Sequence, residues 1–215
     1  MTRRALHWAL LALVAACGDS TAPLRTDRYE WRLFEPNPNG GNDIVLSFAW
    51  PTASQPLKIW AQDTLGLVGH TTSAIQTWQA QFLYGEFRGT MVSDSGDADI
   101  IVVGGPAPAD APVLPSMARQ CQGATDIAVN PQTFLLTPPM HIYIELRFAP
   151  DDPGVDACLA LTTAHELGHA LGIFQHSPDP DDLMYSDPVV SAPSERDRNT
   201  AERAYHTPTT IQLSR

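Results

Sequence analysis

The chain has 215 residues, of which 43% are hydrophobic and 17% charged, and its formal net charge is −11. This length and composition suit one sizeable globular domain and exclude an intrinsically disordered chain. The negative charge argues against nucleic acid as a partner, because phosphate binding needs a basic surface. After the N-terminal segment, no stretch approaches the roughly 18 consecutive apolar residues of a transmembrane helix, so none is expected in the body of the protein.

The N-terminus has the pattern of an export signal. Arg3 and Arg4 form a basic segment, and residues 5–16 form a short, mostly apolar one. The residues that end in Cys17 (Val-Ala-Ala-Cys) resemble a bacterial lipobox, which predicts a lipoprotein-type signal peptide over residues 1–16 and a lipid on Cys17. An ordinary secretory signal that contains a cysteine is the alternative. Both interpretations predict an exported protein, either lipid-anchored in the cell envelope or secreted, that contacts a membrane only through its N-terminal lipid.

The residues after the signal are small and polar. Residues 17–27 have the composition of a flexible tether, so the folded domain is expected to cover residues 28–215. If Cys17 carries lipid, Cys121 and Cys158 form an even pair in an oxidising compartment. A disulfide between them and two separately buried thiols are both compatible with the sequence. Neither cysteine is spaced like a zinc ligand.

The first half of the domain contains strand patterns and one helix pattern. Apolar residues between those strand patterns recur at helical spacing, from Thr71 to Phe82, and predict an amphipathic helix over about 71–83. The strand candidates are residues 29–34, 44–50, 57–60, 87–92 and 98–103.

The second half ends in two helix patterns. Asp151 to Pro153 has the composition of a helix start, with Asp as cap, so a helix is expected over about 154–172. Ser194 to Asp197 resembles a capping box, which predicts a last helix that ends near His206. A loop rich in Gly, Pro and Ala is expected over residues 104–115, before these helices. The strand candidates that follow this loop are residues 126–129 and 141–148.

The first of these two helices carries a metal-ligand pattern. His165 and His169 are four residues apart, and each helical residue turns the chain by roughly 100°, so both imidazoles lie on one face beside Glu166. Gly172 tolerates a left-handed backbone that ends the helix and lets the chain bring His176 back to the same point. Three neutral imidazoles leave the fourth position of a tetrahedral zinc ion open, as a catalytic site requires. The pattern therefore predicts one catalytic Zn²⁺ held by three histidines.

The segment from His165 to Tyr185 resembles the metzincin metallopeptidases, most closely their matrixin-like branch. Their signature is H-E-x-x-H-x-x-G-x-x-H followed by a methionine turn, and its first four defined positions match directly. His176 comes one residue late, with Gln175 at the family position, whereas the spacing from His176 to Met184 is that of matrixins. The resemblance implies an α+β fold: a single compact metzincin-like zincin domain with a mixed twisted sheet, an active-site helix, a Met-turn and a C-terminal helix.

The same resemblance implies a zinc endopeptidase with a protein or peptide substrate. Glu166 would act as general base and then general acid, taking a proton from the attacking water and delivering it to the leaving amine. Met184 would form an apolar floor beneath the metal; the alternative is a core methionine, and the two roles are physically close. Tyr185 would help to wall the pocket for the side chain after the cleaved bond. Metzincins hold their substrate against an edge strand, which is expected here within residues 124–137.

Several alternatives stay open. A surface lipoprotein that uses the fold only for binding or adhesion is the alternative to an enzyme, and a monomer is expected for the protein. The third ligand could be a carboxylate of the last helix in place of His176, either Glu195 or Glu202. Two acidic clusters could bind Ca²⁺ or be ordinary solvated turns, the first being Asp94, Asp97 and Asp99 and the second Asp179, Asp181 and Asp182. Isolated histidines, expected to be surface or core residues, are His70, His141 and His206.

Overall fold

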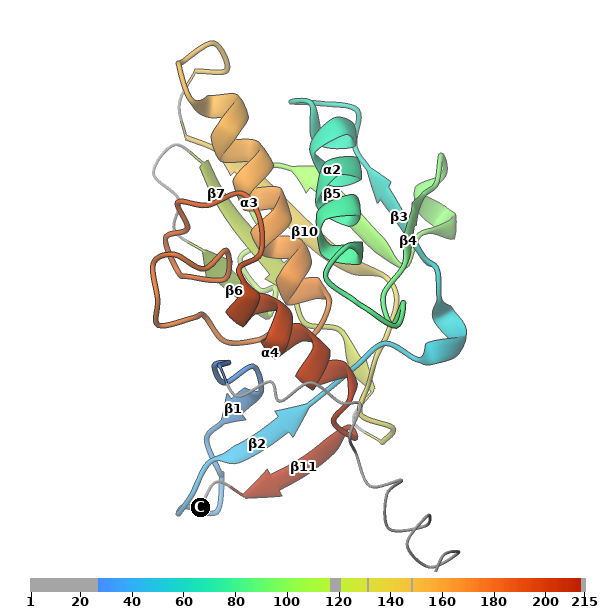
Figure 1. Ribbon diagram of the computed structural model, residues 1–215, viewed down its shortest axis with the longest axis vertical. Coiled ribbons are helices and arrows are strands. Elements are labelled where there is room, and N and C mark those ends of the chain that lie inside the picture. Colours follow the sequence, from blue (N-terminus) through green and yellow to red (C-terminus); the bar gives the residue numbers. More distant parts are fainter. Residues whose placement is uncertain (1–26, 117–120, 131, 148, 214–215) are drawn as a thin grey trace, which may run out of the picture.

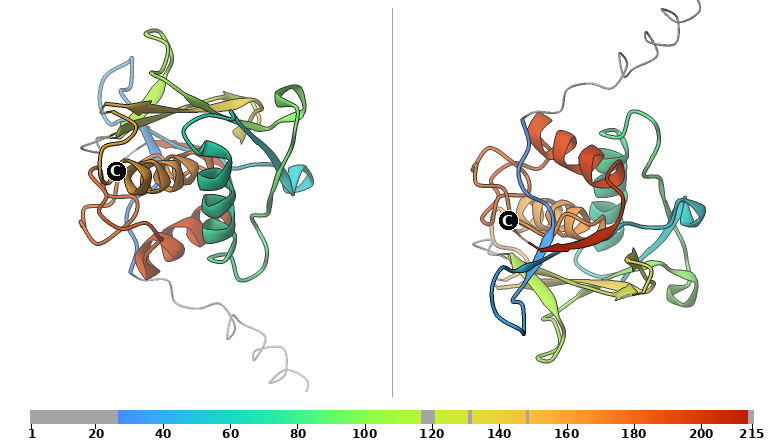
Figure 2. Two further views of the ribbon diagram at one scale, coloured as in Figure 1. Left: turned by 90° about the horizontal axis from the view of Figure 1, so that it is seen from above. Right: turned by 90° about the horizontal axis from the view of Figure 1, so that it is seen from below.

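The structure is a computed structural model, which describes residues 27–116, 121–130, 132–147 and 149–213. The predicted signal peptide, the lipidation candidate Cys17 and all of the tether before residue 27 lie outside the described residues. Helices and strands are separated into layers, as Figures 1 and 2 show. The α+β class with a mixed sheet, expected from the sequence, is what the structure has.

The main sheet has six strands in the order β4-β3-β5-β10-β7-β6. Neighbouring strands from β4 to β10 run parallel, whereas β7 is antiparallel to β10 and β6 is antiparallel to β7. This mixed sheet therefore ends in an antiparallel hairpin on one side. Its strands are β3 (Leu57–Ala61), β4 (Gly89–Met91), β5 (Ile100–Gly104), β6 (Val113–Ser116), β7 (Cys121–Asp126) and β10 (Met140–Leu146).

Helices cover one face of this sheet (Figure 2). The helices α2 (Leu67–Gln79) and α3 (Val155–Ala170) pack on the sheet, and α4 (Glu195–Tyr205) lies on their far side. In β10, Ile142 and Ile144 are completely buried on the helical side, whereas Tyr143 on the other face is only half-buried. The main core therefore lies between the sheet and these helices.

Short elements complete the fold. A second, three-stranded sheet has the order β1-β2-β11, so the first and last strands are held together by β2. No helix in the described part of the chain is long and apolar enough to cross a membrane. These short elements are β1 (Leu33–Glu35), β2 (Ile44–Ser47), β11 (Thr210–Leu213), the pair β8 (Val129–Asn130) and β9 (Leu135–Leu136), and the 3-10 turns η1 (Thr52–Ser54) and η2 (Ser95–Asp97).

The predicted helices exist, with shifted ends. α2 begins four residues before its prediction because Leu67 is completely buried on the same stripe as Thr71 and Trp78. α4 has the predicted capping box, in which Ser194 accepts from the backbone N–H of Asp197. The predicted Asp cap of α3 is wrong: its N-cap is Gly154, in the left-handed conformation and without a side-chain bond.

Two strand predictions and one loop prediction are wrong in position. Residues 29–31 alternate in polarity, but their backbone groups bond α4 and the segment after α3 instead of a strand, so β1 starts only at Leu33. The loop predicted over 104–115 includes the start of β6. The strand predicted over 126–129 lies earlier, at Cys121–Asp126, where weak strand formers are held by pairing on both sides.

The predicted edge strand is also displaced. Residues 124–126 belong to β7, which is an inner strand because β10 and β6 pair with its two sides. β8 and β9, which also lie in that segment, form a separate two-stranded sheet. The sheet margin nearest to α3 is therefore β6, where Pro115 fits because an edge strand tolerates a missing N–H.

Candidate metal centre

The end of α3 is shaped by Gly172. Its φ of +102° is left-handed, and a side chain there would lie 3.0 Å from the carbonyl oxygen of Phe48. The N–H of Gly172 bonds the carbonyl of His169 at 2.9 Å, and the N–H of Ile173 bonds that of Gly168 at 3.2 Å. These two bonds are the pair of a Schellman motif. The chain therefore leaves the helix in one turn and returns toward the face that carries the histidines.

Three imidazoles meet beyond this turn. One ring nitrogen from each of His165, His169 and His176 lies within 4.8 Å of the other two. The Nε2 atoms of His169 and His176 are 3.3 Å apart. Two nitrogens bound to one tetrahedral zinc ion at about 2.0–2.1 Å would be separated by about 3.3–3.4 Å. The three imidazoles are donors that zinc accepts, and the separation of this one pair is that of two ligands on a single ion.

Backbone carbonyls set the tautomers of the two helical histidines. Nδ1 of His165 lies 2.7 Å from the carbonyl oxygen of Leu183, and Nδ1 of His169 lies 2.5 Å from that of Ile173. A carbonyl only accepts, so each Nδ1 is the donor and each Nε2 keeps its lone pair. Nε2 of His165 is buried, and no atom of the described residues hydrogen-bonds it. Both rings therefore present a lone pair to the same point, as in metal sites with a supporting outer shell.

Burial keeps these rings neutral. Burial lowers the pKa of His165 to about 3 and also lowers the pKa of His169. The pKa of His176, whose ring is less completely buried, is lowered for the same reason. Neutral imidazole is the form that binds a metal. Among the described residues, the group contains neither of the carboxylates considered as an alternative third ligand, Glu195 and Glu202.

The segment that carries His176 is paired with the methionine turn. Ser177 and Tyr185 form an isolated parallel bridge, and the N–H of Ser177 donates to the carbonyl of Met184 at 2.8 Å. Met184 is completely buried against α3: a side chain on Gly168 would lie 2.4 Å from its sulfur atom. Gly168 therefore makes room for Met184 beside the two helical ligands. Tyr185 is half-buried at the end of this turn.

Asp197 of α4 fixes the methionine turn. Its completely buried carboxylate accepts from the N–H of Leu183 at 2.7 Å and of Met184 at 3.4 Å. It also accepts from the hydroxyl of Tyr29 at 2.7 Å. Burial raises its pKa, although these hydrogen bonds act in the opposite direction. The capping box indicated the place of Asp197 in the helix, but nothing in the sequence indicated its contact with the metal-site segment.

Glu166 faces β7. Its side chain is completely buried, and the hydroxyl of Thr125 donates to Oε2 at 2.7 Å and lies 3.0 Å from the carbonyl of Glu166. The carboxylate and the three imidazoles therefore come from α3 and its following turn, whereas the group that orients the carboxylate comes from the sheet. Thr125 was missed by sequence reasoning, because no local pattern marks it.

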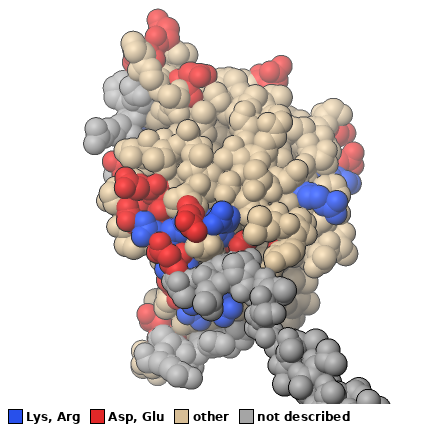
Figure 3. Space-filling view, in the orientation of Figure 1, with Lys and Arg blue, Asp and Glu red and all other residues tan. Residues whose placement is uncertain are grey.

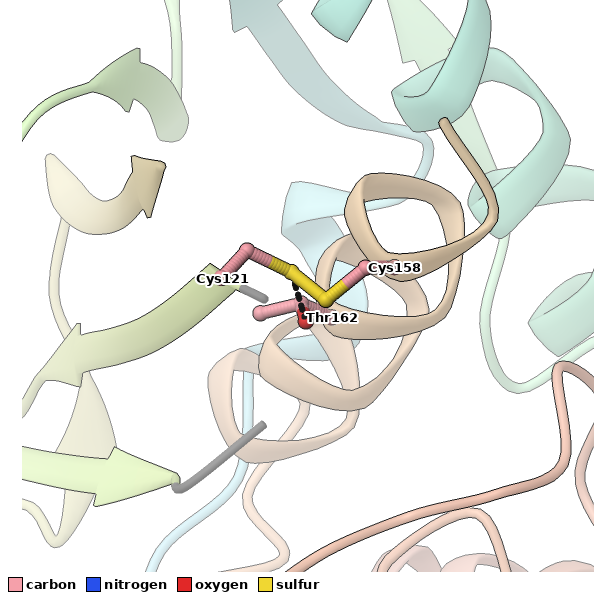
Figure 4. The surroundings of a disulfide bond; sticks show 3 residues. All are labelled: Cys121, Cys158 and Thr162. Carbon is pink, nitrogen blue, oxygen red and sulfur yellow. Dashed lines mark hydrogen bonds between the residues drawn. A yellow bond between two sulfur atoms is a disulfide. The ribbon is translucent and has the colours of Figure 1, made fainter. Parts of the chain in front are cut away.

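The two cysteines of the domain are joined. A disulfide connects Cys121, the first residue of β7, to Cys158 near the start of α3 (Figure 4). A disulfide sulfur carries no proton, so Thr162 is the donor in its 3.1 Å contact with the sulfur of Cys121. The strand that contacts Glu166 is therefore covalently attached to the helix that carries it.

The second acidic cluster surrounds an arginine. Asp182 is buried and accepts hydrogen bonds from Ser177, Ser194 and Arg196, and Arg196 also pairs with Asp179 at 2.6 Å. Figure 3 shows acidic and basic side chains gathered together over the start of α4. Asp179 and Asp182 thus share the guanidinium of Arg196 as their counter-ion.

Two carboxylates of the first acidic cluster accept hydrogen bonds from backbone N–H groups. Asp94 accepts from the N–H of Gly96 at 2.8 Å, and Asp99 accepts from that of Lys58 at 2.8 Å. Within the described residues, neither cluster forms a convergent group of three metal-ligating side chains. The calcium prediction thus has no support from these side chains.

The remaining histidines lie beside carboxylates away from the cluster. His141 is 2.9 Å from Asp126 and His206 is 2.6 Å from Glu86. The third, His70, is 3.3 Å from Asp156.

No protein-family model matches the sequence, and no curated protein is significantly similar to it. Among solved structures, the crystal structure of myroilysin matches at 16% sequence identity, with a TM-score of 0.32. That alignment covers 90% of this chain and 78% of the other. The assignment of a function therefore depends on the geometry of the site.

Proposed function

We propose that the protein is a zinc-dependent endopeptidase whose metal ligands are His165, His169 and His176. One observation carries this proposal: three mostly buried, neutral imidazoles converge on one point, with two of them oriented by backbone carbonyls. Three histidine ligands leave a zinc ion one open position, which distinguishes a catalytic site from a structural one. Zinc in that position supplies Lewis-acid chemistry, which polarises a carbonyl and acidifies water.

Glu166 supplies the proton transfer in this proposal. It follows His165 directly on α3, and its completely buried side chain packs against β7. It accepts the proton of the attacking water on a carboxylate oxygen and then delivers that proton to the leaving amine. Its Oε2 accepts a hydrogen bond from Thr125, which orients the carboxylate in this proposal.

We place the domain with the metzincin metallopeptidases of matrixin-like type. The proposal is supported by the Gly172 turn, the third histidine and the packing of Met184 against Gly168. Gln175 adds one residue to the turn before His176, and the imidazole of His176 still joins the cluster. A peptide substrate would lie extended along the sheet margin formed by β6, with Tyr185 beside the side chain after the cleaved bond.

We also propose that the protein works outside the cytoplasm, lipid-anchored through Cys17 or secreted. The disulfide between Cys121 and Cys158 supports this, because disulfides persist in oxidising compartments. Labelling the expressed protein with a radioactive fatty acid tests the anchor. The wild type is expected to take up label and Cys17→Ser is not.

Elemental analysis and a digestion assay test the proposed function. The purified protein is expected to contain about one zinc ion per chain and to cleave an unfolded protein substrate until a chelator is added. Glu166→Gln is expected to keep the zinc and lose at least about 100-fold in kcat. His176→Ala is expected to lose zinc, whereas the control His206→Ala, beside Glu86, keeps both zinc and activity.

Two results would contradict the proposal. Full peptidase activity in Glu166→Gln would remove the glutamate from the mechanism. A wild type that binds zinc but cleaves no unfolded protein or peptide-library member would favour the binding module instead.

A further inference from the structure

The strand β7 leaves a space for Glu166. An added Cβ at Gly123 would lie 2.2 Å from Oε1 of Glu166 and 2.5 Å from its Cγ, far inside van der Waals contact. Gly123 does not have a positive φ, so its backbone would accept other residues. The absence of a side chain at Gly123 is therefore explained by the carboxylate that fills the space.

The same face of β7 supplies a hydrogen-bond donor. Thr125 is two residues after Gly123, and alternate residues of a strand share a face. Its hydroxyl lies 2.7 Å from Oε2 of Glu166, and its side chain is buried. An ionised carboxylate only accepts, so Thr125 donates. Gly123 and Thr125 thus both contact the Glu166 carboxylate. Gly123 leaves room for it, and Thr125 donates a hydrogen bond to it.

Several bonds fix β7 relative to α3. Thr125 is paired with Ile142 of β10 on one side and Leu114 of β6 on the other, so it lies on an inner strand. Upstream, the disulfide from Cys121 ties β7 to α3 two helical turns before Glu166 (Figure 4). A site built on regular elements is held more closely than one built on loops.

We infer that Gly123 and Thr125 form a cradle that positions the Glu166 carboxylate for proton transfer, with Thr125 as a positioning residue. This inference rests on the proposed peptidase function and names residues that its motif does not contain. The bond from Thr125 to Oε2 limits rotation of the carboxylate. A misplacement of about 1 Å in such a group can lower a rate by about 100-fold.

The isosteric change Thr125→Val tests the inference. It is expected to keep the zinc content and the KM of the wild type and to lower kcat by about 10- to 100-fold. Thr125→Ser, which restores the hydroxyl, is expected to recover most of kcat. The matched control is Thr90→Val, an exposed threonine of β4, which is expected to leave kcat and KM unchanged.

Crystal structures of the wild type and Thr125→Val supply a readout apart from activity. The Glu166 carboxylate is expected to rotate away from its wild-type position in the valine variant and to return in the serine variant. Gly123→Ala is expected to displace the carboxylate as well, with a kcat loss at least as large as that of Thr125→Val.

The outcomes separate the cradle from the proposed function. A wild-type protein without zinc or without peptidase activity would overturn both. An active wild type whose Thr125→Val variant keeps its kcat, or keeps Glu166 in place, would overturn the cradle alone. Equal loss of zinc in the valine and serine variants would show that Thr125 only supports the fold, which also overturns the cradle.

Discussion

The buried carboxylate of Asp182 shows how a single ion pair can make stability depend on pH. Burial alone would raise the pKa of Asp182, but hydrogen bonds from Arg196, Ser177 and Ser194 outweigh burial and lower it below 3.8. Well above pH 3.8 the carboxylate is charged in both the folded and the unfolded chain, and its stabilisation is complete. As the pH falls through the folded-state pKa, the unfolded chain has already taken up the proton, so this stabilisation is lost.

Arg196→Met tests this contribution. We expect the free energy of unfolding near neutral pH to fall by about 1.5–3 kcal/mol, the range for hydrogen bonds to charged groups. The difference from wild type is expected to shrink as the pH is lowered from about 5 to about 3, because the charge of Asp182 is then lost. Urea unfolding of the wild type and of Arg196→Met at several pH values measures this difference in the free energy of unfolding.

Arg198→Met is the matched control for that experiment. Arg198 pairs with Glu195 at 3.1 Å, but the Glu195 side chain is 77% exposed. An exposed pair of this kind contributes little to stability. A difference between wild type and Arg196→Met that stays constant over the whole pH range would contradict the role given to the Asp182 charge.

At the scale of elements, the segment before β1 supports the metal site. The hydroxyl of Tyr29 donates to the carboxylate of Asp197, which also accepts from the N–H of Leu183. The carbonyl of Leu183 in turn accepts from Nδ1 of His165. The carbonyl of Trp31 accepts from the N–H of Phe174 at 2.7 Å, in the turn that precedes His176. The short segment before β1 thus contacts both segments that follow α3.

Tyr29→Phe tests the first of these contacts. The change removes one hydrogen bond to a buried carboxylate and keeps the ring, so we expect the free energy of unfolding to fall by about 1.5–3 kcal/mol. Thermal and urea unfolding measure the loss. Tyr84→Phe is the control, since that side chain is 63% exposed and should leave the stability unchanged. Equal stability of Tyr29→Phe and wild type would show that the contact is dispensable.

At the scale of the whole molecule, the disulfide connects the two layers. It joins β7 of the sheet to α3 of the helical layer across 37 residues of sequence. In the chain-entropy model, a loop of this length stabilises the folded state by about 4 kcal/mol. The crosslink therefore acts on the same strand and helix that bring Thr125 to Glu166.

The double variant Cys121→Ser, Cys158→Ser tests this contribution. We expect its free energy of unfolding to be lower by about 4 kcal/mol and its urea midpoint to fall accordingly. A reducing agent should destabilise the wild type and leave the double variant unaffected. A wild type that is insensitive to the reducing agent after unfolding and refolding in it would contradict a stabilising disulfide.

Local patterns were sufficient for the helices and for the ligand residues. His165, Glu166 and His169 are related by helical geometry, and Gly172 by the need for a left-handed residue at the helix end. The capping box of α4 is likewise a matter of neighbouring residues. Such features depend on contacts within a few positions, so one sequence contains them.

Other features depended on partners far along the chain. The sequence of β7 has a low strand propensity, and the strand forms because β10 and β6 pair with it. Residues 29–31 have a strand pattern, but α4 and the turn after α3 take up their backbone groups. Thr125, Gly123 and Asp197 acquire their contacts with the site only when the sheet, α3 and α4 are brought together.

The sequence by itself therefore predicted the cluster of three histidines, the helix that carries two of them and the turn that returns the third imidazole, because helical periodicity and glycine conformation are local properties. Only the tertiary structure decided which strand orients Glu166, which strand forms the sheet margin and what supports the methionine turn. Those choices depend on strand pairing and on packing between segments distant in sequence, and no spacing of residues encodes them separately.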